Sequence, residues 1–473
     1  MCDYSHLRIH QYKGDLLKIF MQVKQFENKN LSHFSYAILS DCEKKIILID
    51  PSRDPQHYLD FARDSEATIT GVIETHPHAD FVSSHLEFHE IYKASIYTSI
   101  LVEAQYPYHP FDEGKSIQLG KIKLTSINTP GHSPDSICIL LEHEGKQKMI
   151  FTGDTLFIGD CGRPDLRPDK EHSESAAKKL ARQMYYSLRE KIMTLYDDNI
   201  IYPAHGAGTL CGKALSDAKR STLVEEKKNN WSLQNLTEDE FIKELLQDQP
   251  FVPAYFTYDV SLNKKGVKPL LKSIGDVPRL VPIKDEASAS HLNSDLWIID
   301  GRAAGEYKKG HLDKSVNLQI EGKFETWLGS IIQPGEKFYL ANGKEKDLDL
   351  MISRVASIGY EYQVEGAFII NYSPLCEEEL DMTKFKEYMN DYTIIDVRNR
   401  SQVKDKKIFA KSISMPLGDL RSSIKNIPID KPIVVHCASG YRSAVGSSMI
   451  QSVMGNKVKV FDLSERVKQF IGA

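Results

Sequence analysis

The sequence predicts an α/β protein made of about three domains. Its 473 residues fit that number at about 100–200 residues per domain, and 41% hydrophobic with 26% charged residues is ordinary for a folded chain. Two patterns refine this fold class. In the first half, histidines and aspartates directly follow short strands. In the second half, a strand motif around Asp300 recurs around Asp396, 96 positions further along.

Charge and cysteine content exclude several classes of protein. Lys+Arg is 60 and Asp+Glu is 65, a net charge of -5, so we expect no nucleic-acid partner. No apolar run approaches about 18 residues, and the first residues carry charges, so we expect no membrane span and no secretory signal. The 7 cysteines are scattered and odd in number. They favour a reducing compartment, and we expect a cytoplasmic protein.

Short strands that end at turns organise the first half. The expected strands are Ser35–Leu39, Lys45–Asp50, Ala67–Glu74, Lys121–Ile127, Ser136–Leu141, Lys148–Thr152 and Asn199–Tyr202. Helical spacing predicts a helix over Ser173–Asp197 and a charged helical stretch over Ser216–Gln249. The first domain is therefore expected to end near Pro250 and to comprise residues 1–250.

An internal repeat organises the second half. LWIIDGR at 296–302 matches YTIIDVR at 392–398, and the same offset sets Ala341 against Cys437. Each copy alternates strands with helices, which predicts α/β units with parallel sheets. We expect one unit over residues 251–372 and the other over residues 373–473.

The four loops that follow strands in the first half contain candidate metal ligands. They are THPHAD with His76, His78 and Asp80, then PGH with His132, GD with Asp154, and PAH with His205. Imidazole and carboxylate ligands together suit zinc, iron or manganese. Two histidines and one carboxylate on one side of a metal leave positions open for substrate and dioxygen, as in non-haem iron(II) oxygenases.

These motifs give the region from about Tyr12 to Leu215 a resemblance to the metallo-β-lactamase fold. GDTLFIGDCGRPDL, which contains Asp154, resembles the persulfide dioxygenases of that superfamily. The resemblance implies a four-layer αββα sandwich and iron ligands at His76, His132 and Asp154. It also implies that His78, Asp80 and His205 match positions that hold zinc in dinuclear relatives.

Phe81 departs from the dinuclear pattern HxHxDH, because the last histidine is replaced by an apolar ring. The loss of a nitrogen ligand favours a mononuclear centre over the metal-bridging hydroxide of a glyoxalase II-like hydrolase. Persulfide dioxygenases often retain that histidine, so Phe81 is a departure from them as well.

A second loop, HCASGYRS, follows the buried strand PIVV and contains Cys437 and Arg442. Backbone N–H groups of such a loop, together with a cationic side chain, can stabilise an anionic or persulfide sulfur. The loop resembles the CxxGxR active site of rhodaneses, and DVR at Asp396 resembles a rhodanese element. The middle unit has Ala341 at the nucleophile position, so we expect a rhodanese-like domain without sulfur-transfer chemistry.

Four further residues are candidates. Arg163 either binds a substrate carboxylate or forms a salt bridge to Asp160 or Asp165. Tyr202 is a candidate to line the pocket, and Cys211 to hold a persulfide near the metal, as multidomain relatives resembling this sequence imply. Cys161 is a weaker candidate for the same role.

Together these observations predict a persulfide dioxygenase fused to two rhodanese domains. We expect one Fe(II) per chain, with Zn as the alternative, and oxidation of a low-molecular-weight thiol persulfide such as glutathione persulfide to sulfite. Sulfur transfer at Cys437 would link persulfide, sulfite and thiosulfate in sulfide detoxification. We expect a homo-oligomer. The alternatives are a zinc glyoxalase II-like thioester hydrolase with rhodanese appendages, and a non-oxidative sulfur carrier.

Overall fold

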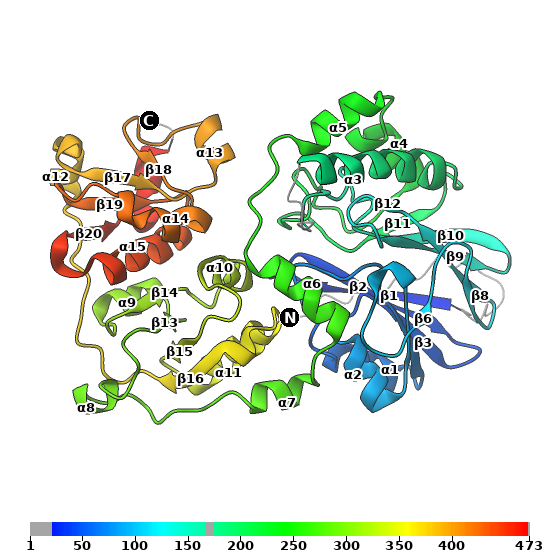
Figure 1. The fold of residues 1–473 in the computed structure, drawn as a ribbon, viewed down its shortest axis with the longest axis horizontal. Helices are drawn as coiled ribbons and strands as arrows, with labels where there is room; N and C mark the ends of the chain where they lie inside the picture. The colour runs from blue at the N-terminus through cyan, green and yellow to red at the C-terminus, as the bar shows by residue number, and fades with distance from the viewer. Residues whose placement is uncertain (1–20, 167–173, 472–473) are drawn as a thin grey trace, which may run out of the picture.

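Two six-stranded sheets form the N-terminal part of the computed structural model, which describes residues 21–166 and 174–471 (Figure 1). Their strand orders are β1-β2-β3-β4-β5-β6 and β12-β11-β10-β9-β8-β7. The first sheet consists of β1 (Met21–Asn28), β2 (His33–Ser40), β3 (Lys45–Ile49), β4 (Thr68–Ile73), β5 (Ser95–Thr98) and β6 (His109–Pro110). The second consists of β7 (Ser116–Leu119), β8 (Ile122–Asn128), β9 (Ile137–His143), β10 (Lys146–Gly153), β11 (Ile200–Pro203) and β12 (Ser221–Thr222).

Apolar side chains of both sheets fill the space between them, among them Tyr36 and Phe151. In β8, Ile122 and Leu124 are buried while Lys123 is exposed, so the two-residue period of a strand presents one apolar face to this core.

Helices cover the outer face of each sheet. They are α1 (Gln56–Asp64) and α2 (His85–Tyr92) on the first sheet, and α3 (Glu174–Tyr186) and α5 (Glu238–Leu246) on the second. Tyr58 and Phe88 anchor the first pair in one apolar cluster, and Met184 and Phe241 anchor the second pair in another. The result is the four-layer αββα sandwich that the sequence predicts.

The helical prediction for 216–249 is wrong, because that segment contains several short elements. It consists of β12, α4 (Leu223–Asn229), the 3-10 helix η3 (Trp231–Leu233) and α5. Asn230 interrupts the helix: its side chain accepts from Ser232 N and donates to the carbonyl of Phe157, 3.0 Å away. The helix predicted from 173 is also shorter, since α3 continues only as the π-helical η2 (Ser187–Ile192).

Two smaller sheets follow, in the orders β14-β13-β15-β16 and β18-β17-β19-β20, with every pairing parallel. Their strands are β13 (Trp297–Asp300), β14 (Ser315–Asn317), β15 (Phe338–Asn342), β16 (Val364–Ile369), β17 (Thr393–Asp396), β18 (Ile413–Ser414), β19 (Ile433–His436) and β20 (Val460–Asp462). The equivalent strand order and the parallel pairing agree with the predicted fold class for both units.

Helices accompany these two sheets and connect them to the sandwich. They are α6 (Tyr255–Lys265), α7 (Leu270–Gly275), α8 (Glu286–Ala289), α9 (Ala304–Lys309), α10 (Phe324–Ile331), α11 (Glu345–Ala356), α12 (Met382–Glu387), α13 (Arg400–Asp405), α14 (Leu417–Ser423) and α15 (Tyr441–Met454). Short 3-10 helices are η1 (Ile100–Val102), η4 (Tyr360–Gln363), η5 (Met389–Asp391), η6 (Ile424–Asn426), η7 (Gly455–Lys457) and η8 (Ser464–Phe470). Within residues 21–166 and 174–471, no helix is long and apolar enough to cross a membrane.

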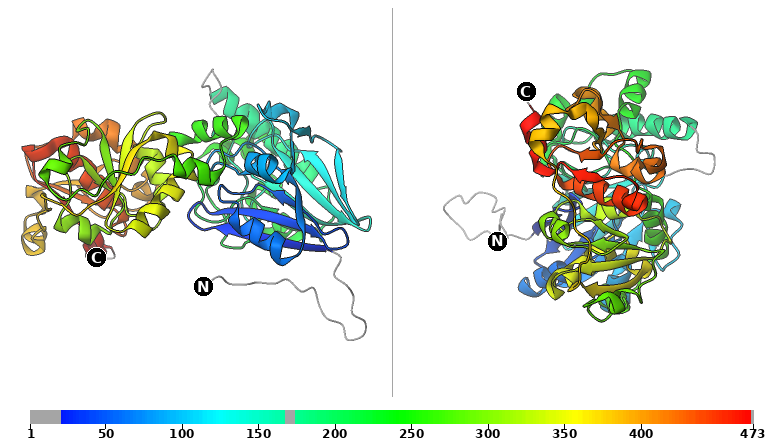
Figure 2. Two further views of the ribbon diagram at one scale, coloured as in Figure 1. Left: turned by 90° about the horizontal axis from the view of Figure 1, so that it is seen from below. Right: turned by 90° about the vertical axis from the view of Figure 1, so that its left-hand side faces the viewer.

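The last unit packs its long helix α15 against β14, the edge strand of the middle sheet. Ser448 Oγ accepts a hydrogen bond from Asn317 N at 2.9 Å, and Ser452 Oγ donates to the carbonyl of Ser315 at 2.8 Å. Figure 2 shows the two units together at one end of the molecule and the sandwich at the other. Helix α6 lies between the sandwich and the middle unit (Figure 1).

Candidate metal centre and sulfur-transfer loop

Three of the predicted ligands meet at one edge of the sandwich. His76 follows β4, His132 follows β8 and Asp154 follows β10, and all three are buried with ligand atoms within 4.8 Å of one another. Nε2 of His76 lies 3.8 Å from Asp154 Oδ2, and Nε2 of His132 lies 3.5 Å from the same oxygen. Two imidazole nitrogens thus converge on one carboxylate oxygen.

Hydrogen bonds at Nδ1 orient both imidazoles. Thr75 Oγ1 donates to Asp50 Oδ2 at 2.8 Å, so it accepts from His76 Nδ1, which is 3.0 Å away. Nδ1 of His132 donates to the carbonyl of Arg163 at 2.9 Å. With the proton on Nδ1 in each ring, Nε2 carries the lone pair that a metal requires.

The surroundings of Asp154 leave one of its oxygens free for a metal and favour its ionised form. Its Oδ1 accepts from His205 Nδ1 at 2.8 Å, whereas its Oδ2 is buried and has no hydrogen-bond partner among the described residues. Burial opposes ionisation, but His205, His132 and His76 together hold the pKa of Asp154 well below its usual value. A buried, ionised oxygen facing two imidazoles fits a divalent cation.

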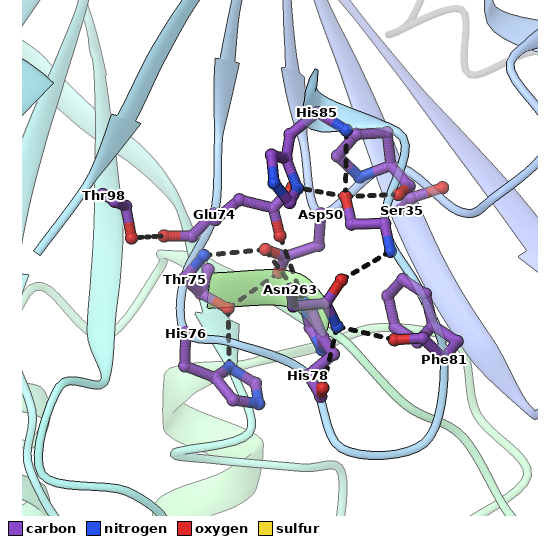
Figure 3. A network of polar contacts seen from close by, with 12 residues as sticks. Ser35, Asp50, Glu74, Thr75, His76, His78, Phe81, His85, Thr98 and Asn263 are labelled. Atoms are coloured by element: carbon purple, nitrogen blue, oxygen red, sulfur yellow. Dashed lines mark hydrogen bonds and ion pairs between the residues drawn. The ribbon is translucent and has the colours of Figure 1, made fainter. Parts of the chain in front are cut away.

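His78 does not join this group. Its Nε2 lies 3.1 Å from Asp50 Oδ1 and 3.9 Å from Glu74 Oε2, and these three residues form a group of their own (Figure 3). Burial opposes protonation of His78, but Asp50 and Glu74 outweigh it and raise the pKa of the ring. Phe81 packs against His78, with ring centroids 4.4 Å apart.

Asp80 and His205 form a separate group with Cys211, again with ligand atoms within 4.8 Å. His205 Nε2 lies 2.9 Å from Asp80 Oδ2, so this imidazole bridges Asp80 and Asp154. Burial raises the pKa of the Cys211 thiol, and the carboxylates of Asp80 and Asp154 raise it further. Cys211 therefore lies beside the metal ligands, as a thiol in a negatively charged surrounding.

Arg163 and Tyr202 are both buried. Nε and Nη2 of Arg163 donate to both oxygens of Asp165, at 2.7 and 2.6 Å, and Nη1 donates to the carbonyl of Pro250. This is the salt-bridge alternative to substrate binding. Tyr202 stacks on Phe151 in the core between the sheets. Cys161 lies in the apolar cluster under α3.

In the last unit, Cys437 lies between β19 and the start of α15. Its side chain is buried, and Gly440 N donates to its Sγ at 3.1 Å. Gly440 has φ +108°, a left-handed conformation that suits glycine and turns the loop back toward the sulfur. Burial lowers the pKa of the Arg442 guanidinium, and its interaction with Cys437 acts against this shift. The guanidinium therefore lies close enough to Cys437 to interact with the sulfur.

The middle unit keeps the scaffold of this loop without the thiol. Arg302 donates to both oxygens of Asp300 and to the carbonyl of Gly310 at 2.8 Å. Arg398 makes the same contacts to Asp396 and to the carbonyl of Lys406 at 2.9 Å. Ala341 is buried in β15. Arg302 and Arg398 thus make matched contacts at equivalent places in the two units.

Comparison with known proteins bears on both ends of the chain. The metallo-beta-lactamase superfamily profile matches residues 30–185, and the rhodanese-like domain profile matches residues 381–465. A solved metallo-beta-lactamase from Staphylococcus aureus subsp. aureus COL is 30% identical, with a TM-score of 0.64 over 74% of this chain and 99% of its own. The chain belongs to the metallo-β-lactamase superfamily. Its C-terminal part adds a rhodanese-like domain that contains Cys437.

Relatives in this superfamily differ in activity. Persulfide dioxygenase ETHE1, mitochondrial, of Mus musculus is 30% identical over 222 residues, which is 46% of this chain and 78% of the relative. The hydroxyacylglutathione hydrolase, cytoplasmic isozyme, of Saccharomyces cerevisiae is 30% identical over 153 residues, 30% of this chain and 56% of the relative.

Three residues that orient the candidate metal centre were not predicted from the sequence. Asp50 and Thr75 orient His76, and Asn263 on α6 donates to the carbonyls of the loop after His76 (Figure 3). Asp50 and Thr75 each stand at a strand end, a signal that could have indicated them. Asn263 lies outside the sandwich and carries no such signal.

Proposed function

We propose that this protein is an Fe(II)-dependent persulfide dioxygenase coupled to rhodanese sulfur transfer. The single observation that carries the proposal is the preorganised set of two imidazoles and one carboxylate, with Phe81 in place of a further nitrogen ligand. The similarity to a relative named persulfide dioxygenase supports it. The substrate would be a low-molecular-weight thiol persulfide such as glutathione persulfide.

In this proposal His76, His132 and Asp154 hold one iron per chain. Bound Fe(II) would supply open positions at which the persulfide sulfur and dioxygen meet. Thr75 and the Arg163 carbonyl keep the two imidazoles in the binding tautomer, and His205 holds the outer oxygen of Asp154. Overall, the terminal sulfur leaves as sulfite, with two oxygens from dioxygen and one from water, and the thiol is regenerated.

Sulfur transfer would take place at Cys437. Its thiolate attacks the outer sulfur of a donor persulfide or thiosulfate, the donor S–S bond breaks, and the donor leaves with the bonding electron pair. Gly440 N and Arg442 stabilise the resulting Cys437 persulfide anion. Sulfite from the metal site can then accept that sulfur to form thiosulfate. Cys211, beside the metal ligands, is a candidate second sulfur carrier.

The test is anaerobic purification with metal analysis, followed by oxygen-electrode assay on glutathione persulfide. We expect one iron per chain and oxygen uptake with sulfite formation. Zinc content with thioester hydrolysis and no oxygen uptake would overturn the proposal. The group of Asp80, His205 and Cys211 and the hydroxyacylglutathione hydrolase relative favour that zinc hydrolase as the second candidate.

The proposal also includes location and assembly. The six cysteines in the described part of the chain are all unpaired, which suits a reducing compartment such as the cytoplasm. We propose a homo-oligomer, to be tested by light scattering.

A further inference from the structure

The loop after His76 is held from outside the sandwich, by Asn263 of α6. Nδ2 of Asn263 donates to the carbonyl of His78 at 2.8 Å and to that of Phe81 at 2.7 Å. Its Oδ1 accepts from Ser83 N at 2.8 Å. Asn263 is 2% exposed and sits inside the bend of this loop (Figure 3). Its amide thus makes three hydrogen bonds to one six-residue segment.

Two more contacts join the same loop to other parts of the chain. Tyr255, also on α6, donates from its hydroxyl to the carbonyl of Asp80 at 3.3 Å. Val82 N donates to the carbonyl of Ser357, which ends α11 of the middle unit, at 2.8 Å. The loop is therefore fixed by the connecting helix and by the unit whose nucleophile position is Ala341.

The loop is connected to the metal site through side chains. Asp80 Oδ2 lies 2.9 Å from His205 Nε2, and His205 Nδ1 lies 2.8 Å from Asp154 Oδ1. This contact on Oδ1 sets the rotation of the Asp154 carboxylate, and so directs Oδ2 toward His76 and His132. A displacement of the loop would move Asp80, then His205, then Asp154.

We propose that Asn263 is a positioning residue for the metal centre, through which α6 fixes the orientation of Asp154, while the middle unit holds the same loop at Val82. The middle unit then serves the metal site as a support rather than as a sulfur carrier. The inference rests on the metal site of the proposed function, but not on the identity of the metal or on the reaction.

Asn263→Asp is the decisive variant, because it keeps the size and shape of the side chain. It replaces the two Nδ2 donors with a carboxyl oxygen that faces two carbonyl oxygens, to neither of which it donates when ionised and to only one of which it donates when protonated. A residue that only fills space would tolerate this change. Asn317→Asp is the matched control: Asn317 is equally buried and also donates to two backbone carbonyls, those of Asp300 and Arg302, but within the middle unit.

The experiment uses the full-length chain loaded with Co(II), whose visible d–d spectrum reports ligand geometry, and the iron-loaded chain for kinetics. For Asn263→Asp we expect a changed Co(II) spectrum and a fall in kcat of about 10-fold or more, with KM for the persulfide little altered. Asn317→Asp should keep the wild-type spectrum. Tyr255→Phe, which removes one hydroxyl and keeps the ring, should shift the Co(II) spectrum in the same direction by less.

A wild-type spectrum and wild-type kcat in Asn263→Asp would overturn the inference. If that variant fails to fold, a wild-type spectrum in Tyr255→Phe would overturn it instead. Failure of the proposed function appears differently, as a wild-type protein that binds metal and consumes no oxygen. In that case the Co(II) spectra still decide the role of Asn263.

Discussion

At the scale of the residue, the hydrogen bond at Nδ1 of each imidazole determines which ring nitrogen is available to a metal. Asp50, Thr75 and the carbonyl of Arg163 assign the proton to Nδ1 of His76 and His132. A neutral imidazole has two tautomers, and only one of them presents Nε2 to the metal. The tautomers of His76 and His132 are therefore set by residues outside the group of candidate ligands.

Thr75→Val tests this role. It removes the hydroxyl between Asp50 and His76, so we expect metal affinity to fall by about 10- to 100-fold. Competition with a metal-binding indicator measures the change. Thr70→Val is the control, since Thr70 lies on β4, the strand that precedes Thr75, and its hydroxyl donates to the carbonyl of Ile46 at 3.4 Å. Equal affinities of Thr75→Val and wild type would contradict the assignment.

Cys437→Ser separates the two chemistries. The oxygen of serine cannot carry sulfane sulfur, so we expect sulfurtransferase activity to disappear and oxygen uptake on persulfide to persist. Cys376→Ser, at an exposed cysteine between the two units, should leave both activities intact. Loss of oxygen uptake in Cys437→Ser would favour the sulfur-carrier alternative.

The sequence indicated the candidate ligands, but not the directions of their side chains. His76 and His78 belong to one motif, and nothing in its spacing shows that His78 turns toward Asp50 and Glu74. Arg163 is a similar case, because CGRPD is compatible with a bound carboxylate and with the observed ion pair to Asp165. Such choices depend on neighbours that are distant along the chain.

At the scale of the element, the loop after β10 is confined by close backbone packing. An ideal Cβ on Gly162 would lie 1.9 Å from the carbonyl oxygen of Asp154 and 3.0 Å from Nδ1 of His132. A side chain at this position would therefore push against two of the three candidate ligands, Asp154 and His132.

Gly162→Ala should accordingly lose metal and stability together. We expect bound metal well below one equivalent and a lower midpoint of thermal unfolding, since the clash is with backbone that cannot rotate away. Gly305→Ala, on α9, is the control, because its Cβ would meet no described atom within 4 Å. A fully metal-loaded Gly162→Ala protein would show that the loop is more adaptable than its packing indicates.

Strands were easier to predict than helices in this chain. The strands β3 and β10 end at Ile49 and Gly153, each within one residue of the expected ends at Asp50 and Thr152, because apolar runs bounded by turn residues mark buried strands. The helical spacing over 216–249 is real but discontinuous. Asn230 and the Thr237–Glu240 capping box divide it into separate helices. Side-chain contacts that end or begin a helix leave no mark in the spacing of apolar residues.

At the scale of the whole molecule, a buried ion cluster joins the sandwich to the middle unit. Arg53 lies 3.6 Å from Glu87 of the sandwich and 3.7 Å from Glu361 of the middle unit. Burial raises the pKa of Glu361 from 4.5 to about 7, although Arg53 acts against this shift. The repeat gave the number of units, but this contact could not be predicted from it.

Glu361 makes stability depend on pH. Between about pH 4.5 and 7 the folded protein retains a proton on Glu361 that the unfolded chain releases, so stability falls as the pH rises through this window. Glu361→Gln removes that loss, up to about 3 kcal/mol. We therefore expect the difference in thermal unfolding midpoint, variant minus wild type, to be larger at pH 8 than at pH 5. Glu365→Gln, at an exposed position, should show no such gain, and equal differences at both pH values would contradict the prediction.

The packing of α15 on β14 has a consequence for any attempt to separate the units. An open edge strand presents unpaired N–H and C=O groups and invites pairing with another chain. Here Ser448 and Ser452 occupy two of those groups on β14, at Asn317 and Ser315. A chain truncated before α15 would expose this edge. We therefore expect the truncated protein to form β-rich aggregates, because the unit that contains Cys437 would no longer cover the open edge of the unit that contains Ala341.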